Sequence, residues 1–219
     1  MKTHALLLIL SLLAAPAWPE DIASVLERSQ AGRLDTLAPS TAPGALALQQ
    51  SFDRLLKELH PAMPAELKVV DVGVIAETLR GRTIVLNAAL GDLPEVCRLF
   101  LLAHELGHIQ AGHWAQRIAL YRRYIPGEVV QEQTDAIAPQ LGREASMQAH
   151  QQEFDADAYA MRTMLDMGYT RDELLDMFMH LGNYGQTATH PSSAKRMAQL
   201  RMIDEERRMA KASSGEAAH

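Results

Sequence analysis

One stretch of the sequence, residues 95–113, constrains the chain more than any other. It contains His-Glu-x-x-His at His104, Glu105 and His108. Positions four apart lie about 40° apart around an α-helix, so both imidazoles can face one point. Residues 95–106 are largely apolar and lack Gly and Pro, which predicts a buried helix. Two neutral imidazoles at this spacing suit Zn²⁺, and the neighbouring carboxylate suits a general base that acts on water. The alternative is a core helix with two hydrogen-bonded histidines.

A catalytic zinc site takes three protein ligands and a water, so a third ligand must come from elsewhere in the chain. Glu153 is the best candidate, because it opens an apolar, Ala-rich stretch and Asp157 follows four residues later on the same helix face. Glu153 could bind the metal while Asp157 orients a ligating histidine through its other ring nitrogen. A solvated acidic helix start is the alternative. His150, in a Gln-rich stretch, is a weaker ligand candidate. His113 lies about 140° around the helix from His108, which predicts that it points elsewhere and makes a structural hydrogen bond.

Composition narrows the class of protein. The chain has 219 residues, 47% of them hydrophobic, which favours one domain with a sizeable core. A net charge of −6 leaves no basic stripe for nucleic acid. The single cysteine, Cys97, excludes an intramolecular disulfide and a Cys-rich zinc site, and we expect it to be a buried thiol.

The N-terminus has the features of an export signal. A basic start, an apolar run and small residues at a cleavage position predict a signal peptide over residues 1–17, with an uncleaved anchor as the alternative. We expect an N-terminal arm over 18–43, the main domain over 44–210 and a disordered tail over 211–219. The expected location is the periplasm or the exterior, reached through a cleaved signal peptide.

Hydrophobic periodicity predicts an α+β, mainly helical fold with a small β-sheet beside the metal-binding helix. Helices are predicted over 44–60 and from residue 95 to about 124, with strands over 67–74 and 83–86 that a polar segment, 76–82, separates. Residues 128–150 are polar and predict an exposed loop with a broken helix. Another helix follows from about residue 145, and Thr170 with Glu173 forms a capping-box pattern that opens the next. We expect strand 83–86 to be an exposed sheet edge.

Three sequence blocks carry a resemblance to a known family. The first is the motif at 104–108 with His113 five residues on, the second is Glu153-Phe-Asp-Ala-Asp157, and the third is Thr189-His190-Pro191 followed by Arg196. In this order they resemble the zinc metallopeptidases of the HtpX and CaaX-prenyl-protease type, family forty-eight of the metallopeptidases. The resemblance covers roughly residues 67–200 and is closest to the soluble periplasmic type.

The resemblance implies a zincin fold of the gluzincin kind and a proteolytic activity. It implies that one Zn²⁺ per chain is held by His104, His108 and Glu153, with Glu105 as the general base. Asp157 and Arg196 would support the ligands from behind. His190 would be catalytic and would stabilise the oxyanion of the reaction intermediate. Alternatively, it would occupy the fourth zinc position and inhibit the enzyme. A third option is a histidine that caps a nearby acidic residue.

The expected function is therefore an exported zinc endopeptidase that cuts extended or misfolded proteins, with a role in envelope protein quality control as one setting. Polypeptides are the expected substrates and nucleic acid is not an expected partner. Peripheral contact with the membrane or with envelope assembly proteins fits this expectation. The alternative function is a chaperone-like or assembly-factor module with a latent zinc site, and a peptidase specialised for one partner is a third.

Overall fold

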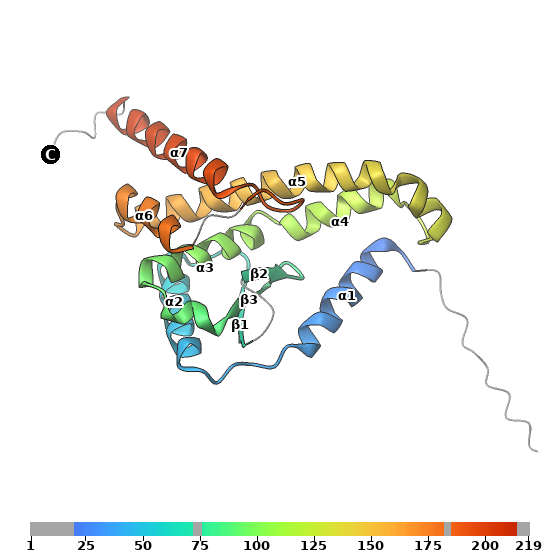
Figure 1. Cartoon of the computed structure of the whole chain (residues 1–219), viewed down its shortest axis with the longest axis horizontal. Coiled ribbons are helices and arrows are strands. Elements are labelled where there is room, and N and C mark those ends of the chain that lie inside the picture. The colour runs from blue at the N-terminus through green and yellow to red at the C-terminus, as the bar shows by residue number, and fades with distance from the viewer. Residues whose placement is uncertain (1–19, 72–75, 182–184, 214–219) are drawn as a thin grey trace, which may run out of the picture.

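The structure is a computed structural model, and it describes residues 20–71, 76–181 and 185–213. Its elements in chain order are α1 (Ile22–Thr36), α2 (Pro43–Leu59), β1 (Glu66–Val70), β2 (Ala76–Leu79), β3 (Thr83–Asn87), the 3₁₀ helix η1 (Ala88–Asp92), α3 (Glu95–Gln110), α4 (His113–Tyr124), α5 (Gln131–Asp166), α6 (Arg171–Leu181) and α7 (Ser193–Ser213). The predicted α+β, mainly helical class is confirmed (Figure 1). The predicted signal peptide lies outside the described residues, as do residues 214–219 of the predicted tail.

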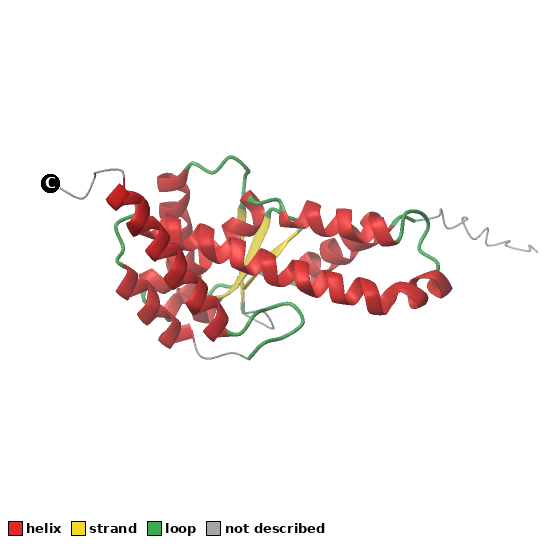
Figure 2. Cartoon of the chain, turned by 90° about the horizontal axis from the view of Figure 1, so that it is seen from above, coloured by secondary structure: helices red, strands yellow, loops and turns green. Residues whose placement is uncertain are grey.

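The sheet has three strands in the order β1-β3-β2 and lies among the helices (Figure 2). β3 pairs in parallel with β1 and antiparallel with β2, so it is the central strand. The expectation that strand 83–86 forms an edge is therefore wrong. Residues 76–82, expected to separate two strands, contain β2, which is an edge strand beside α3. β2 was missed because Ala-Glu-Thr-Leu has no strong strand pattern and is held by its pairing with β3.

The main core lies where α2, β3, α3 and the C-terminal half of α5 meet, and α6 and α7 close it. Leu48, Phe52 and Leu55 recur on one face of α2, which explains why that helix forms and which side it buries. Cys97 is a free, buried thiol in this core, as expected. The capping box at Thr170 and Glu173 is confirmed, since each side chain bonds the other residue's backbone N–H, at 3.3 Å and 2.7 Å.

The segment expected to be an unspecified N-terminal arm contains helix α1. Asp21 caps it by accepting a 2.9 Å hydrogen bond from the N–H of Ser24. Ile22 joins a second cluster with Leu120, Ile125 and Leu141, while the end of α1 packs on the sheet through Leu34. Tertiary contacts, more than periodicity, therefore hold α1 in place.

Residues 128–150 are not a loop, because α5 runs without a break through most of them. It has 36 residues and includes Pro139. The N-terminal half of α5 lies beside α4 (Figure 1), with Leu141 and Ile137 packed against the cluster of Leu120 and Ile125. Its sequence lacks a wide apolar stripe, so these few packing contacts support the helix. Among the described residues, no helix has the combination of length and apolar character that crossing a bilayer requires.

Candidate metal centre

Two helices bring the three predicted ligands together. His104 and His108 project from α3, and Glu153 projects from α5, which packs against it. The Nε2 atoms of the two histidines lie 3.2 Å apart. Glu153 Oε2 is 3.6 Å from His104 Nε2, and Glu153 Oε1 is 3.4 Å from His108 Nε2. The three side chains therefore present nitrogen and oxygen atoms around a common centre.

This triangle fits a tetrahedral zinc site. Ligand atoms about 2.0–2.1 Å from one ion, at the tetrahedral angle, lie about 3.3 Å apart. The three observed separations, 3.2 to 3.6 Å, are close to that value. Oε2 of Glu153 is buried and accepts no hydrogen bond from a described residue, which a bound cation would satisfy. Two imidazoles and a carboxylate are also a ligand set found in catalytic zinc sites.

Asp157 and Arg196 lie behind His104. His104 Nδ1 is 2.9 Å from Oδ1 of Asp157, which is completely buried. Arg196 of α7 donates to both oxygens of that carboxylate, from Nε at 2.7 Å and from Nη2 at 2.6 Å. Burial acts to raise the pKa of Asp157, but the hydrogen bonds from Arg196 and His104 outweigh it and lower the pKa. An ionised Asp157 holds the proton of His104 on Nδ1 and leaves Nε2 for a metal.

The site favours positive charge at the ligands. Burial would lower the pKa of His104, yet its hydrogen bond to Asp157 and the neighbouring carboxylate of Glu153 raise that pKa to about 10. Burial would raise the pKa of Glu153, and the neighbouring His104 and His108 lower it. Two carboxylates around one imidazole thus attract a cation, which is either a proton or a metal ion.

Helix geometry predicts that His113 points away from His108, and this prediction is wrong. The left-handed backbone of Gly112, with φ of 66°, separates α3 from α4 and turns the chain. His113 Nδ1 therefore returns to 2.8 Å from His108 Nδ1. Burial and the neighbouring His108 lower the pKa of His113 to about 4, which keeps its ring neutral. The predicted structural hydrogen bond exists, and it orients a candidate ligand.

Glu105 lies beside the ligands and is buried. Oγ1 of Thr78, from the edge strand β2, donates to Glu105 Oε2 at 2.8 Å. One cleft is lined by Thr78, Glu105, His108 and Glu153. β2 therefore fixes the orientation of the carboxylate that lies next to the candidate metal ligands.

His190 and His150 occupy different positions relative to the cluster. His190 also lines the cleft, with Nε2 3.7 Å from Glu153 Oε1, and its side chain is 58% exposed. His150 Nε2 instead lies 2.8 Å from the carbonyl oxygen of Thr187, outside the three-residue cluster. The structure thus places His190, and not His150, next to the candidate ligands.

Gly107 lets the two ligand-bearing helices come close together. A Cβ at this position would lie 3.1 Å from both the Cα of Ala156 and the Cβ of Tyr159. Contacts this short leave little room for any side chain. The glycine inside the motif therefore has a packing role, which places α5 at the distance from α3 that Glu153 needs.

Sequence reasoning missed two parts of this site. The roles of Thr78 and of the α1 face that lines the cleft depend on contacts between residues 27 or more positions apart, and no local pattern signals them. The return of His113 had one local signal, Gly112, because glycine favours the backbone conformation that ends a helix. The structure brings together His104, His108 and Glu153, and it places Asp157 and Arg196 next to His104.

Comparison with known families supports this geometry. No curated protein matches the chain. A family model described as Peptidase family M48 matches residues 46–204, which include all three sequence blocks and the whole ligand cluster. Members of this family are metallopeptidases of the zincin fold. The chain therefore belongs to peptidase family M48 and is a metallopeptidase.

Proposed function

We propose that this protein is an exported, zinc-dependent endopeptidase that hydrolyses peptide bonds in extended or misfolded proteins. The observation that carries the proposal is the juxtaposition of three elements in one cleft. These are the tetrahedrally spaced ligands, the buried Glu105 and the edge strand β2. His104, His108 and Glu153 would hold one Zn²⁺ per chain.

The proposed reaction uses Glu105 as the general base. Zinc, when bound, supplies a Lewis acid that polarises the scissile carbonyl and lowers the pKa of water. Glu105 takes a proton from the attacking water and later gives it to the leaving amine. Thr78 engages Oε2 of Glu105, so Oε1 is the oxygen that carries the proton. Asp157 and His113 keep the protons of His104 and His108 on Nδ1.

β2 is the proposed docking edge for an extended substrate. Among the described strands, β2 pairs only with β3, and all of Glu77, Thr78 and Leu79 line the cleft. A peptide that adds to this edge binds mainly through its backbone, which makes sequence preference loose. Misfolded chains expose such extended segments, which supports a role in protein quality control.

His190 is proposed to act on the substrate side of the cleft. Its exposed ring lies at the rim of the ligand cluster, 3.7 Å from Glu153, and Pro191 restricts its backbone. From this position it can donate to the oxyanion that develops on the scissile carbonyl. A small movement of the ring would instead make it a fourth ligand, which would block the site. The two roles predict opposite effects of its removal.

Export and an envelope location are proposed from the first 17 residues. Their charge, apolar run and small residues are typical of a signal peptide. Mass spectrometry of the exported protein should find an N-terminus near Trp18. A retained Met1 would indicate an anchor and contradict cleavage.

Glu105→Gln tests the function. The variant should keep about one zinc per chain and lose at least about 100-fold in hydrolysis of unfolded casein, because it removes proton transfer but not ligation. A chelator should abolish wild-type activity. The alternative, a chaperone-like module with a latent zinc site, predicts instead no chelator-sensitive hydrolysis by either protein.

A further inference from the structure

The cleft extends from the metal cluster to helices outside the catalytic motif. Its volume is about 520 Å³. α1 and α4 also contribute to the lining of this cleft, through Leu26, Ser29, Gln30, Arg33, Trp114 and Arg117. The four α1 residues have the i, i+3, i+4, i+7 spacing of one helix face. α1 precedes the part of the chain that the family model matches, so its share of this wall lies outside that model, whereas α4 lies within it.

The acidic side chains around the cleft already have partners. Glu153 belongs to the ligand cluster, and Glu105 accepts from Thr78. Glu77 pairs with Arg33 at 2.7 Å. One oxygen of Glu27 accepts from the Trp114 indole at 2.9 Å, and the other from Arg80 at 3.1 Å. The anionic groups of the cleft are therefore engaged in holding the metal site or α1.

Arg117 is different from these groups. It is half-buried in the cleft wall, yet it makes no ion pair or hydrogen bond with any residue that the structure describes. It follows His113 by four residues, so it lies on the same face of α4, about one turn further on. The rings of His113 and His108 are 4.9 Å apart. Arg117 is therefore a charged residue of the cleft wall that has no ion-pair partner among the described residues and lies one helical turn from His113, which contacts His108 of the ligand cluster.

We propose that Arg117 binds a carboxylate of the polypeptide substrate and thereby sets a preference for acidic groups near the scissile bond. This inference rests on the proposed peptidase function. One turn of α4 rises about 5.4 Å, which is the length of roughly two residues of an extended peptide, so the preference is expected within a few residues of the scissile bond. A guanidinium can bind a carboxylate through two parallel hydrogen bonds, which gives both strength and geometry. The carboxylate is either an Asp or Glu side chain or the substrate C-terminus.

The test uses quenched fluorescent peptides with Glu, Gln or Lys at each of four positions on both sides of the scissile bond. Each peptide is made with an amidated and with a free C-terminus. For the wild type, Glu at one position should raise kcat/KM at least about tenfold over Gln. If the recognised carboxylate is the C-terminus of the substrate, kcat/KM should instead be higher for peptides with a free C-terminus than for the amidated peptides.

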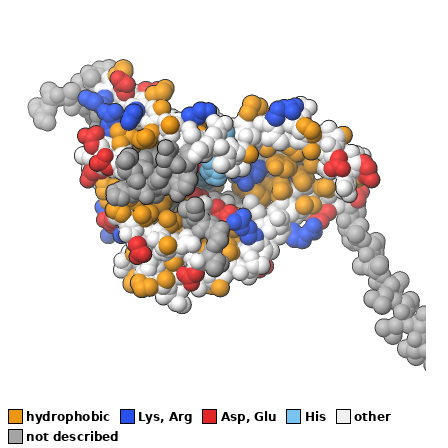
Figure 3. Space-filling view, in the orientation of Figure 1, with side chains coloured by type: hydrophobic (Ala, Val, Ile, Leu, Met, Phe, Trp, Pro, Cys, Tyr) orange, Lys and Arg blue, Asp and Glu red, His pale blue; other side chains and the backbone are white. Residues whose placement is uncertain are grey.

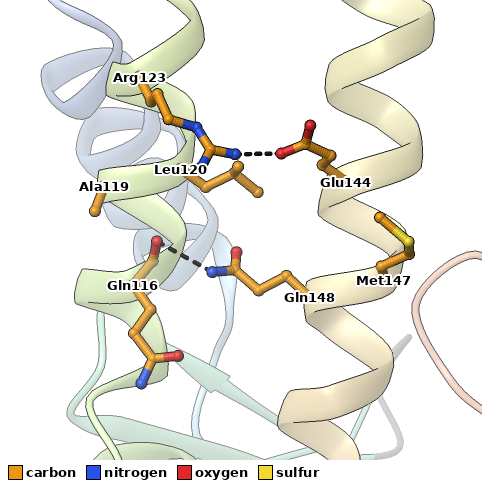
Figure 4. A pocket seen from close by; sticks show the side chains of 7 residues that line it. All are labelled: Gln116, Ala119, Leu120, Arg123, Glu144, Met147 and Gln148. Carbon is orange, nitrogen blue, oxygen red and sulfur yellow. Dashed lines mark hydrogen bonds and ion pairs between the residues drawn. The ribbon is translucent and has the colours of Figure 1, made fainter.

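Variants of Arg117 identify the group responsible. Arg117→Gln should abolish the preference, Arg117→Glu should reverse it in favour of Lys, and Arg117→Lys should retain part of it. Arg123→Gln is the matched control on α4, because Arg123 faces Glu144 across a separate groove between α4 and α5 (Figure 4). The control should keep the wild-type preference, and every variant should keep its zinc.

Binding measurements separate this proposal from the proposed function. In the Glu105→Gln background, a Glu-containing peptide should bind at least about tenfold more tightly than its Gln analogue, and Arg117→Gln should remove the difference. Equal binding of the two peptides, or a Glu preference that survives Arg117→Glu, overturns the role of Arg117. Absence of wild-type hydrolysis with intact carboxylate-dependent binding would instead reject the peptidase function alone.

Discussion

The buried carboxylate of Asp157 offers a quantitative test of how the metal centre is supported. It accepts from Arg196 at 2.6 Å and 2.7 Å and lies 2.9 Å from His104, with no solvent exposure. In Asp157→Asn the side chain keeps its shape, but its NH₂ group can face the N–H donors of Arg196, and Arg196 loses its counter-charge. Breaking a buried pair in this way costs about 3–5 kcal/mol. Metal affinity should fall about 10–100-fold, because His104 is no longer held in one tautomer.

Urea unfolding of the metal-free protein measures the first effect, and competition with a coloured zinc chelator measures the second. Asp155→Asn is the control on the same helix, because Asp155 is exposed; it should change stability by less than about 0.5 kcal/mol. Asp157→Asn with Arg196→Gln should cost less than the sum of the two single changes, with a coupling of about 2 kcal/mol. Additive single changes, or equal effects of Asp157→Asn and Asp155→Asn, would refute the reasoning.

The pKa of Asp157 adds a condition to this test. Because the folded state lowers that pKa, the stability that Asp157 contributes is fully present above its unfolded pKa, about 4. It is lost as the pH falls through the lowered folded value. The difference between the wild type and Asp157→Asn should therefore be constant near neutral pH and shrink in acid.

Two further substitutions test the remaining site residues. Glu153→Ala should lower zinc affinity and reduce the stabilisation that zinc gives in thermal unfolding, whereas His150→Ala should retain both. Normal zinc binding by Glu153→Ala would mean that another residue is the third ligand. His190→Ala should keep zinc and reduce kcat on a peptide more than it changes KM, if the ring stabilises the oxyanion. Higher activity of this variant on unfolded protein would make His190 an inhibitory ligand, and unchanged kinetics on both substrates would exclude both roles.

Those parts of the structure that depend on local chain geometry could be predicted from the sequence. The helical repeat alone places His104 and His108 on one face of α3, and it places Glu153 and Asp157 on one face of α5 in the same way. The capping box at Thr170 is equally local. These predictions agree with the structure because the elements involved are strongly periodic or carry their own end signals.

The parts that sequence reasoning missed are held by distant contacts. The polar first half of α5 is helical because Ile137 and Leu141 pack on the cluster of α4, and its own sequence favours a loop. The sheet order could not be read from strand composition, because the central position of β3 depends on β2, a strand defined by pairing alone. Figure 3 shows histidine side chains near the middle of one face of the molecule.

The close contact at Gly107 also determines how the site responds to mechanical disturbance. α5 has 36 residues, and its Ala156, three residues from Glu153, packs against Gly107 of α3. If α5 rotates as a rigid rod about this contact, Glu153 is about 4–5 Å from the pivot and Gln131 is about 37 Å from it. A 1 Å displacement at Gln131 then moves Glu153 by only about 0.1 Å. The longer part of α5, N-terminal to Glu153, lies outside the site. A partner that displaces the N-terminal end of α5 therefore leaves the spacing of the ligand atoms almost unchanged.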